Sequence, residues 1–351
     1  MTISETLPPA DLTKDDDDGW EQPKTRSRNR IKKPISLVAL RKEVNMTITP
    51  DHPRRKYYSR EWEEKKNVQH WGQRKLLLSE ILFLTRWGHL ASTVLYVGAS
   101  PGFHIKYLMT LFPDHNFILV DPNPFQIEAS ERITLHNRLF DEEMAQSFAG
   151  QKLLFISDIR TADHRQMSLK ENEQMVAKDN EAQIKWVQIL KPIKAMLKYR
   201  CPYANVIDGG SQMFKGTLFL QAWAPPSSTE TRLVVDDSFE LTTYDHLAYE
   251  EWLFHHNSVD RLKTYSQPIQ TGGLDQSYDA SMEVLILAEY LETFPDYQYQ
   301  DPDSPDVDLR STILQMSGEI SKVISPTGRT LSNRYTMATT YKRPELGVCQ
   351  L

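Results

Sequence analysis

The chain has 351 residues, 40% of them hydrophobic, and a formal net charge of −6. This composition can fill a sizeable core, in one large α/β domain or two smaller ones, and it excludes a uniformly basic nucleic-acid binder. Only Cys201 and Cys349 are present and no apolar run reaches membrane-spanning length, which excludes a disulfide framework, a cysteine-rich zinc site and a membrane-spanning helix.

The first fifty residues show no sustained periodicity and are predicted to be a flexible extension, followed by one folded domain over residues 51–325 and a tail over 326–351. An acidic run, Asp15–Asp18, comes before a basic region. From Lys24 to Lys75 there are 16 Lys or Arg residues against 5 Asp or Glu. A local basic region on an acidic protein suits a polyanion that binds at one place, and the alternative is a solvated arm.

Helix-like and strand-like segments alternate along the predicted domain. A helix that is apolar around most of its circumference is expected over residues 70–88, followed by a buried strand at 92–98, a helix at 101–112 and a strand at 116–121. Further strands are predicted at 152–160, 195–202, 217–223 and 230–235, and further helices within 180–190 and at 246–261 and 279–294. This alternation predicts an α/β fold with a doubly wound central sheet flanked by helices.

The loop "GASPG", residues 98–102, follows the first predicted strand. It has neither the spacing and lysine of a phosphate loop nor the G-x-G-x-x-G dinucleotide fingerprint. Gly98 and Gly102 still let a ligand approach the backbone closely, and Asp121 ends the next strand, where a carboxylate can accept both hydroxyls of a ribose. A ribose acceptor without a phosphate cradle points to S-adenosyl-L-methionine. The alternative is a strand-to-helix turn that binds no ligand.

Six segments together resemble one known family. They are "HWGQRKLLLSEILFL", "LYVGASPGFHIKYL", "RLFDEE", "LLFISDIR", "LKYRCPY" and "APPSSTETRL", and the resemblance covers roughly residues 55–325. The family is the poxvirus-type cap-specific mRNA (nucleoside-2′-O-)-methyltransferase, which is also the small regulatory subunit of the viral poly(A) polymerase. The resemblance implies a Rossmann-like methyltransferase domain over 51–325 that uses S-adenosyl-L-methionine, in a diverged relative from a large DNA virus.

The resemblance also implies a catalytic tetrad. By motif position, the tetrad falls on Lys75, Asp158, Lys198 and Glu230. Methyl transfer to a ribose 2′-oxygen requires an in-line geometry and help in removing the hydroxyl proton. We expect Lys198 to be the base, with its pKa depressed by Lys75, and Asp158 and Glu230 to orient both lysines. Taken singly, Lys75 or Lys198 could be a solvated lysine, Asp158 a helix-capping residue and Glu230 a charge at the edge of a strand.

The donor site implied by the same resemblance surrounds the glycine loop. Its residues are Gln73, Tyr96, Gly98, Gly102, His104, Asp121, Asn123, Leu139, Phe140, Asp158 and Arg160. Asn123 stands where the family has an arginine, so the adenosine contacts there are rebuilt. His104 lacks a second ligand at helical spacing, and we expect no metal site.

For the methylated cap, the family uses two aromatic side chains and acidic residues, because a positively charged base stacks on aromatic faces. Tyr203 matches one aromatic residue and Glu250 matches one acid, whereas Asn205 replaces an acid and Ser227 replaces the second aromatic. Tyr57 or Tyr58 could approach from the N-terminal side. The cap pocket is therefore expected to be present but altered.

Three expectations concern partners and location. The transcript is expected to follow a positively charged groove. The candidate residues for this groove are Arg54, Arg55, Lys56, Arg60, Lys65 and Lys66. The alternative is that these residues form only a charged helix face. An RNA-binding processivity partner of the poly(A) polymerase catalytic subunit is the alternative function, and a small-molecule methyltransferase is disfavoured. No hydrophobic signal region opens the chain, and we expect the host cytoplasm, at the viral factory, with the virion as a second location.

Overall fold

The computed structural model describes residues 37–57, 71–163, 166–295, 309–324 and 331. Eight strands form the main sheet, in the order β1-β8-β9-β6-β5-β2-β3-β4, and β7 (Gly210–Phe214) pairs antiparallel with β10 (Leu241–Asp245) in a second sheet. The strands of the main sheet are β1 (Thr47–Ile48), β2 (Thr93–Val97), β3 (Asn116–Val120), β4 (Ile133–His136), β5 (Leu154–Ser157), β6 (Lys194–Tyr199), β8 (Gly216–Phe219) and β9 (Thr231–Val235). The helices are α1 (Leu37–Glu43), α2 (Gly72–Trp87), α3 (Ile105–Leu111), α4 (Glu142–Ser147), α5 (Leu169–Leu190), α6 (His246–Ser258), α7 (Tyr278–Thr293) and α8 (Leu309–Ile324).

The strand order reverses beside β2. From β2 the chain adds β3 and then β4 on one side, and it returns to add β5 and then β6 on the other, all in parallel pairs. Strands β9, β8 and β1 continue the sheet in antiparallel pairs. The predicted doubly wound, Rossmann-like α/β fold is confirmed. Open sheets of this kind bind ligands where the order reverses, at the carboxyl ends of β2 and β5.

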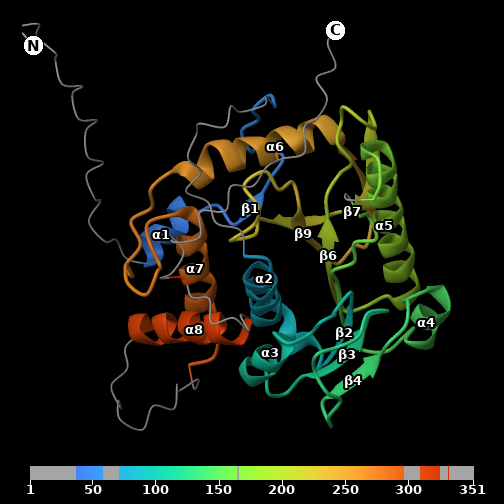
Figure 1. The fold of residues 1–351 in the computed structure, drawn as a ribbon, viewed down its shortest axis with the longest axis horizontal. Coiled ribbons are helices and arrows are strands. Elements are labelled where there is room, and N and C mark those ends of the chain that lie inside the picture. Colours follow the sequence, from blue (N-terminus) through green and yellow to red (C-terminus); the bar gives the residue numbers. More distant parts are fainter. Residues whose placement is uncertain (1–36, 58–70, 164–165, 296–308, 325–330, 332–351) are drawn as a thin grey trace, which may run out of the picture. The chain divides into compact units, whose positions relative to one another are not determined.

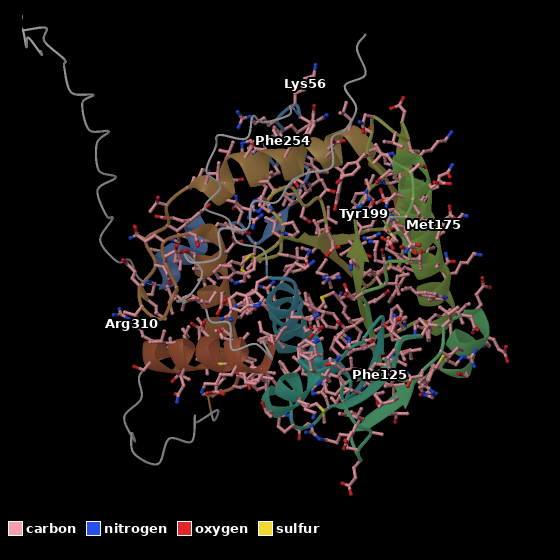
Figure 2. All side chains as sticks on the ribbon, in the orientation of Figure 1. Lys56, Phe125, Met175, Tyr199, Phe254 and Arg310 are labelled. Atoms are coloured by element: carbon pink, nitrogen blue, oxygen red, sulfur yellow. The ribbon has the colours of Figure 1, made fainter. Side chains whose placement is uncertain are left out.

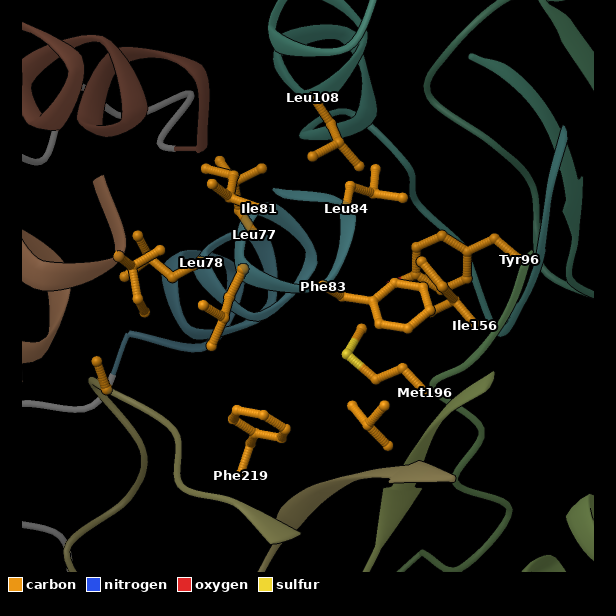
Figure 3. Close-up of a cluster of buried hydrophobic side chains, with 14 of the residues drawn as sticks. Leu77, Leu78, Ile81, Phe83, Leu84, Tyr96, Leu108, Ile156, Met196 and Phe219 are labelled. Carbon is orange, nitrogen blue, oxygen red and sulfur yellow. The ribbon is translucent and has the colours of Figure 1, made fainter. Parts of the chain in front are cut away.

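Helices cover both faces of the main sheet. Figure 1 shows α4 and α5 on one side and α2, α3, α7 and α8 on the other. Helix α2 confirms the helix predicted over 70–88, and it is largely buried, as its apolar circumference indicated. Figure 3 shows side chains of α2, among them Phe83, packed against Tyr96, Ile156, Met196 and Phe219. This packing holds α2 against β2, β5, β6 and β8.

The predicted boundary at residue 51 lies too late in the chain. Helix α1 and strand β1 fall inside the predicted extension, and Thr47 pairs with Phe219 of β8 in the main sheet. A two-residue strand has no periodicity to detect, and only its pairing partner defines it. Helix α8 was not predicted either, and its buried face includes Ile313, Met316 and Ile320. Most of the predicted extension and tail lies outside the described residues, so those two predictions stand otherwise unchanged.

A buried charged network joins α2 to α7 and α8. The guanidinium of Arg74 donates to both carboxylate oxygens of Glu283, at 2.7 and 2.5 Å, and neither side chain has any exposed surface. Arg74 also donates to Ser321 Oγ and to the Ser317 carbonyl, both at 2.9 Å, and Trp223 Nε1 donates to Glu283 at 2.8 Å. Because Arg74 precedes Lys75 on α2, this network holds the start of the helix in place.

Cys201 is expected to be unreactive in the folded protein. The thiol is buried after β6, with Tyr199 Oη 3.2 Å from Sγ, and burial raises its pKa to about 12. Because the thiolate is the nucleophile, the alkylation rate of Cys201 at pH 8 should be at least about 1,000-fold below that of the unfolded chain. Peptide mass spectrometry after iodoacetamide treatment, with and without denaturant, measures this ratio. Equal rates would contradict the burial of this thiol.

Among the described residues, no helix combines the length and the apolarity needed to cross a membrane.

Candidate active site

The four predicted tetrad residues converge at the carboxyl edge of the parallel strands. Asp158 directly follows β5, and Lys198 lies near the end of β6, the next strand. Glu230 directly precedes β9, which runs antiparallel to β6 and therefore starts at the same edge. Lys75 reaches this edge from the first turn of α2. Four segments far apart in sequence thus contribute one polar side chain each.

The distances define one ion-pair cluster. Lys75 Nζ lies 2.5 Å from Glu230 Oε1. Lys198 Nζ lies 3.2 Å from Asp158 Oδ1 and 3.6 Å from Glu230 Oε2. All four side chains are 12–15% exposed, so they are largely buried but still reach solvent. A polar substrate group can therefore contact the cluster from one side.

Arg232 is a fifth member that the sequence analysis missed. Its Nη1 lies 2.6 Å from Asp158 Oδ1 and its Nη2 lies 3.6 Å from Glu230 Oε1. In the β6–β9 pair its Cα is directly opposite that of Lys198, and opposite residues project on the same face. The signal in the sequence was its spacing, because Arg232 follows Glu230 by two residues and strand side chains repeat with a period of two.

The cluster keeps its carboxylates ionised. Burial alone would raise the pKa of Glu230, but Lys198, Lys75 and Arg232 outweigh burial, so its pKa falls well below the usual range. The pKa of Asp158 is also lowered, because Arg232 and Lys198 outweigh the opposing effect of burial. Burial lowers the pKa of Lys75; Glu230 opposes this effect, and Arg232 and Lys198 add to it. Four cations, Lys75, Lys198, Arg232 and Arg160, thus surround the two carboxylates, with Arg160 3.8 Å from Glu230.

The glycine loop lies against this cluster. Gly98 has φ +80°, and a Cβ there would lie 2.8 Å from the carbonyl carbon of Asp158, so the loop can pass only without a side chain. Gly102 has φ +76°. At the end of β3, Asp121 accepts hydrogen bonds from the backbone N–H of Ser100 at 3.1 Å and of Asn123 at 2.8 Å. The Asn123 amide donates to the same carboxylate at 3.0 Å. Loop, acid and tetrad thus share one edge of the sheet.

Tyr96 and His104 lie deeper than the other residues predicted for the donor site. Both are fully buried, and both contact Glu80 Oε1 of α2, Tyr96 Oη at 2.5 Å and His104 Nε2 at 3.1 Å. Burial and then Glu80 raise the pKa of Tyr96 well above its usual value, so it stays a neutral donor. Glu80 was not predicted. This buried group connects α2, β2 and the start of α3 beneath the glycine loop.

The other predicted donor residues surround the same edge. Gln73 Oε1 is buried and has no hydrogen-bond partner among the described residues. Arg160 follows Asp158 and lies 3.8 Å from Glu230 Oε2 and 3.7 Å from Asp179 Oδ2. Leu139 is 67% exposed, whereas Phe140 is buried, with its ring centroid 5.0 Å from that of Trp186. The apolar surface available to a ligand here is therefore that of Leu139.

Two of the predicted cap residues lie together. The Arg200 guanidinium stacks 4.7 Å from the ring centroid of half-buried Tyr203, and the N–H of Ala204 donates to Glu250 Oε2 of α6 at 3.3 Å. Asn205 is exposed next to them, and Ser227 is exposed in the loop before β9. Tyr58 lies outside the described residues.

Part of the predicted basic groove packs on α6. Arg54 donates to Glu251 at 2.8 Å, and the Tyr57 ring lies 5.1 Å from that of Phe254. Lys56 is exposed. Arg55 donates to Ser258 Oγ at 3.1 Å. The other three candidates, Arg60, Lys65 and Lys66, lie outside the described residues.

Residues 46–315 match a sequence model of the family described as poly A polymerase regulatory subunit. The chain belongs to this family. The match spans both the carboxyl edge with the tetrad and the segments that hold the predicted cap residues, in agreement with the resemblance identified from the motifs.

Two viral proteins have sequences similar to about half of this chain. The cap-specific mRNA (nucleoside-2′-O-)-methyltransferase of Myxoma virus (strain Lausanne) is 30% identical over 219 residues, covering 57% of the chain and 64% of the relative. The enzyme of the same name from Fowlpox virus (strain NVSL) is 31% identical over 194 residues, covering 50% of the chain and 62% of the relative. The match thus spans less than two thirds of these relatives. The match to the solved structure of bluetongue virus VP4 covers 61% of this chain and 38% of the VP4 chain. Its TM-score is 0.35 and the sequences are 15% identical.

Proposed function

We propose that this chain transfers a methyl group from S-adenosyl-L-methionine to the 2′-oxygen of the first transcribed nucleotide of capped mRNA, converting cap 0 to cap 1. The observation that carries the proposal is the convergence of Lys75, Asp158, Lys198 and Glu230 beside the glycine loop. The names of the Myxoma and Fowlpox relatives support the same substrate.

The residues at the carboxyl edge fit the donor. Asp121 offers carboxylate oxygens for ribose hydroxyls, exposed Leu139 offers an apolar surface for adenine, and the orphaned Gln73 Oε1 can accept from an ammonium group. The site lacks a phosphate loop, and the donor carries no phosphate. When bound, the donor supplies an electrophilic methyl group on its sulfonium sulfur.

In the proposed reaction, Lys198 takes the proton of the 2′-hydroxyl as the methyl group reaches the oxygen. Lys198 contacts its carboxylates at 3.2 and 3.6 Å, whereas the ammonium of Lys75 is held by Glu230 at 2.5 Å. The looser contacts leave Lys198 free to hydrogen-bond a substrate. Lys75 and Arg232 place positive charge beside Glu230 and Asp158, and the two carboxylates orient the lysines.

For the cap we propose stacking on Tyr203, with Glu250 accepting from the edge of the base. Tyr203 is half-buried, and Glu250 already contacts the adjacent backbone of Ala204. Replacing Tyr203 by alanine should weaken the binding of a methylated cap analogue by about 10- to 100-fold, the effect of losing one stacked base. Fluorescence titration measures this affinity, and Tyr244→Ala provides an aromatic control. Unchanged affinity would refute the stacking.

Substitution of Asp121 tests the proposed donor-binding site. Asp121→Ala should weaken S-adenosyl-L-methionine binding by about 10- to 100-fold in calorimetry, because hydrogen bonds to a charged group contribute about 1.5–3 kcal/mol. Asp114→Ala, at the exposed turn before β3, is the matched control and should bind normally. Asp121→Asn removes the charge but keeps a side-chain oxygen for the loop N–H groups. Comparing it with Asp121→Ala separates the effect of the charge from the effect of the loop contacts. A normal affinity in Asp121→Ala would remove this residue from the site.

The reaction is tested with radiolabelled S-adenosyl-L-methionine and two short capped RNAs, one with a 2′-hydroxyl and one with 2′-deoxyribose at the first nucleotide. The proposal expects label in the first RNA alone. Label in both would place the methyl group on another atom, such as a guanine nitrogen. Label in neither, with RNA still bound, would favour the second function.

The second function is that of an RNA-binding processivity partner of a viral poly(A) polymerase catalytic subunit, and the name of the matched family favours it. Co-purification with the cognate catalytic subunit, and longer tails made by that subunit in the presence of this chain, would establish it. The two functions do not exclude each other. For either, the host cytoplasm is the proposed location, with the virion as a second one, and fractionation of infected cells tests this.

A further inference from the structure

A cluster of histidine and aspartate side chains lies outside the active site. His52 follows β1, His255 lies in the last turn of α6, and Asp260 lies in the short 3₁₀ helix Asp260–Leu262 that follows α6. One ligand atom from each, His52 Nε2, His255 Nδ1 and Asp260 Oδ2, lies within 4.8 Å of the other two. His52 and Asp260 are buried, and His255 is half-buried.

The three atoms face one another at ion-pair distances, and none of them makes a hydrogen bond of good geometry to a described residue. All three are buried and lack a hydrogen-bond partner among the described residues. A buried polar atom without a hydrogen bond is costly, and one metal ion between the three atoms would give each of them a partner. Each of these atoms can coordinate a metal, since neutral imidazole nitrogens and a carboxylate oxygen are all zinc ligands.

Two of the three distances between the ligand atoms match a tetrahedral metal centre, and the third, between the two imidazole nitrogens, is at most 4.8 Å. Asp260 Oδ2 lies 3.3 Å from His52 Nε2 and 3.4 Å from His255 Nδ1. Ligand atoms bound to zinc at about 2.0–2.1 Å on the corners of a tetrahedron are about 3.3–3.4 Å apart. His256 Nδ1 lies 4.0 Å from the same oxygen, also without a hydrogen-bond partner among the described residues.

The surroundings orient the carboxylate. Lys263 Nζ donates to the other oxygen, Asp260 Oδ1, at 2.7 Å, and the Tyr265 hydroxyl donates to the Asp260 carbonyl at 2.9 Å. These contacts leave Oδ2 directed at the histidines. Supporting hydrogen bonds of this kind are typical of metal ligands.

We propose that His52, His255 and Asp260 bind one zinc ion that fastens the segment after β1 to α6. Two imidazoles and a carboxylate in a largely buried site suit zinc better than the harder magnesium or calcium ions. The segment already contacts α6 through Arg54 with Glu251 and Arg55 with Ser258, and Figure 2 shows Lys56 and Phe254 at this edge. The ligands are about 200 residues apart in sequence, so the ion would close a long loop.

The test uses the full-length protein, stripped with a chelator, loaded with zinc and dialysed. Mass spectrometry of the metal content should find about one zinc per chain, and metal removal should lower the melting temperature by roughly 5 °C. His52→Ala and Asp260→Asn should each reduce zinc content at least about tenfold. His89→Ala, which removes an exposed histidine elsewhere, should retain it.

Cobalt provides a measurement that needs no variant. Cobalt loaded into the wild-type protein should give the intense visible absorption of a tetrahedral site, and zinc should displace it. The proposal is overturned if stripped wild-type protein retains no zinc and shows no such absorption. It is also overturned if folded His52→Ala and Asp260→Asn variants retain as much zinc as the wild type.

Discussion

Replacing Lys198 by alanine should reduce the rate of methyl transfer about 100- to 10,000-fold while changing donor affinity by less than about threefold. General-base catalysis contributes about 100- to 10,000-fold, and the donor contacts lie at Asp121 and the glycine loop. Single-turnover kinetics with capped RNA, together with calorimetry of donor binding, measure the two quantities. Lys185→Ala, an exposed lysine on α5, is the matched control and should retain full activity.

The pH dependence separates the two lysines. Asp158 and Glu230 have lowered pKa values and stay ionised near neutral pH, so a rise of rate with pH reports a lysine that loses its proton. The wild-type rate should rise about tenfold per pH unit below the pKa of the base and then level off. Lys198→Arg should keep the positive charge but lose both the activity and this rise. If Lys75→Arg loses the rise and Lys198→Arg keeps it, the base is Lys75, whose own pKa is lowered by burial.

Replacing Glu283 by alanine should lower the free energy of unfolding by about 3–5 kcal/mol, because it leaves the buried Arg74 guanidinium without its carboxylate. Denaturant unfolding measures the loss. Glu289→Ala is the matched control on the same helix, because its pair with Arg86 is partly exposed and should contribute less than about 1 kcal/mol.

The double variant Arg74→Met/Glu283→Leu isolates the cause. It removes both charges and keeps most of the volume, so it should recover much of the loss seen in Glu283→Ala. A loss under 1 kcal/mol in Glu283→Ala would contradict a buried, unpaired charge. Since Arg74 precedes Lys75, Glu283→Ala should also lower methyl transfer in the fraction that stays folded.

Local patterns determined the fold class. The apolar circumference of α2, the β-branched run of β2 and the acids that end β3 and β5 each depend on neighbouring residues in the chain, so the sequence alone predicts them. The glycine loop was predictable for the same reason, since a positive φ at Gly98 needs glycine whatever surrounds it. The family was identified from short motifs in a fixed order, and the match over residues 46–315 confirms it.

Tertiary structure decided which charges meet. Arg232 lies beside the four tetrad residues because β9 pairs antiparallel with β6. Tyr96 contacts Glu80 because α2 packs on β2. The positions of β1 and α8 likewise depend on distant partners. His52 stands about 200 residues before Asp260, and no spacing rule connects them. A local pattern specifies an element through neighbours in the chain, whereas ion pairs and metal ligands are selected by distance in space, which only the packed fold sets.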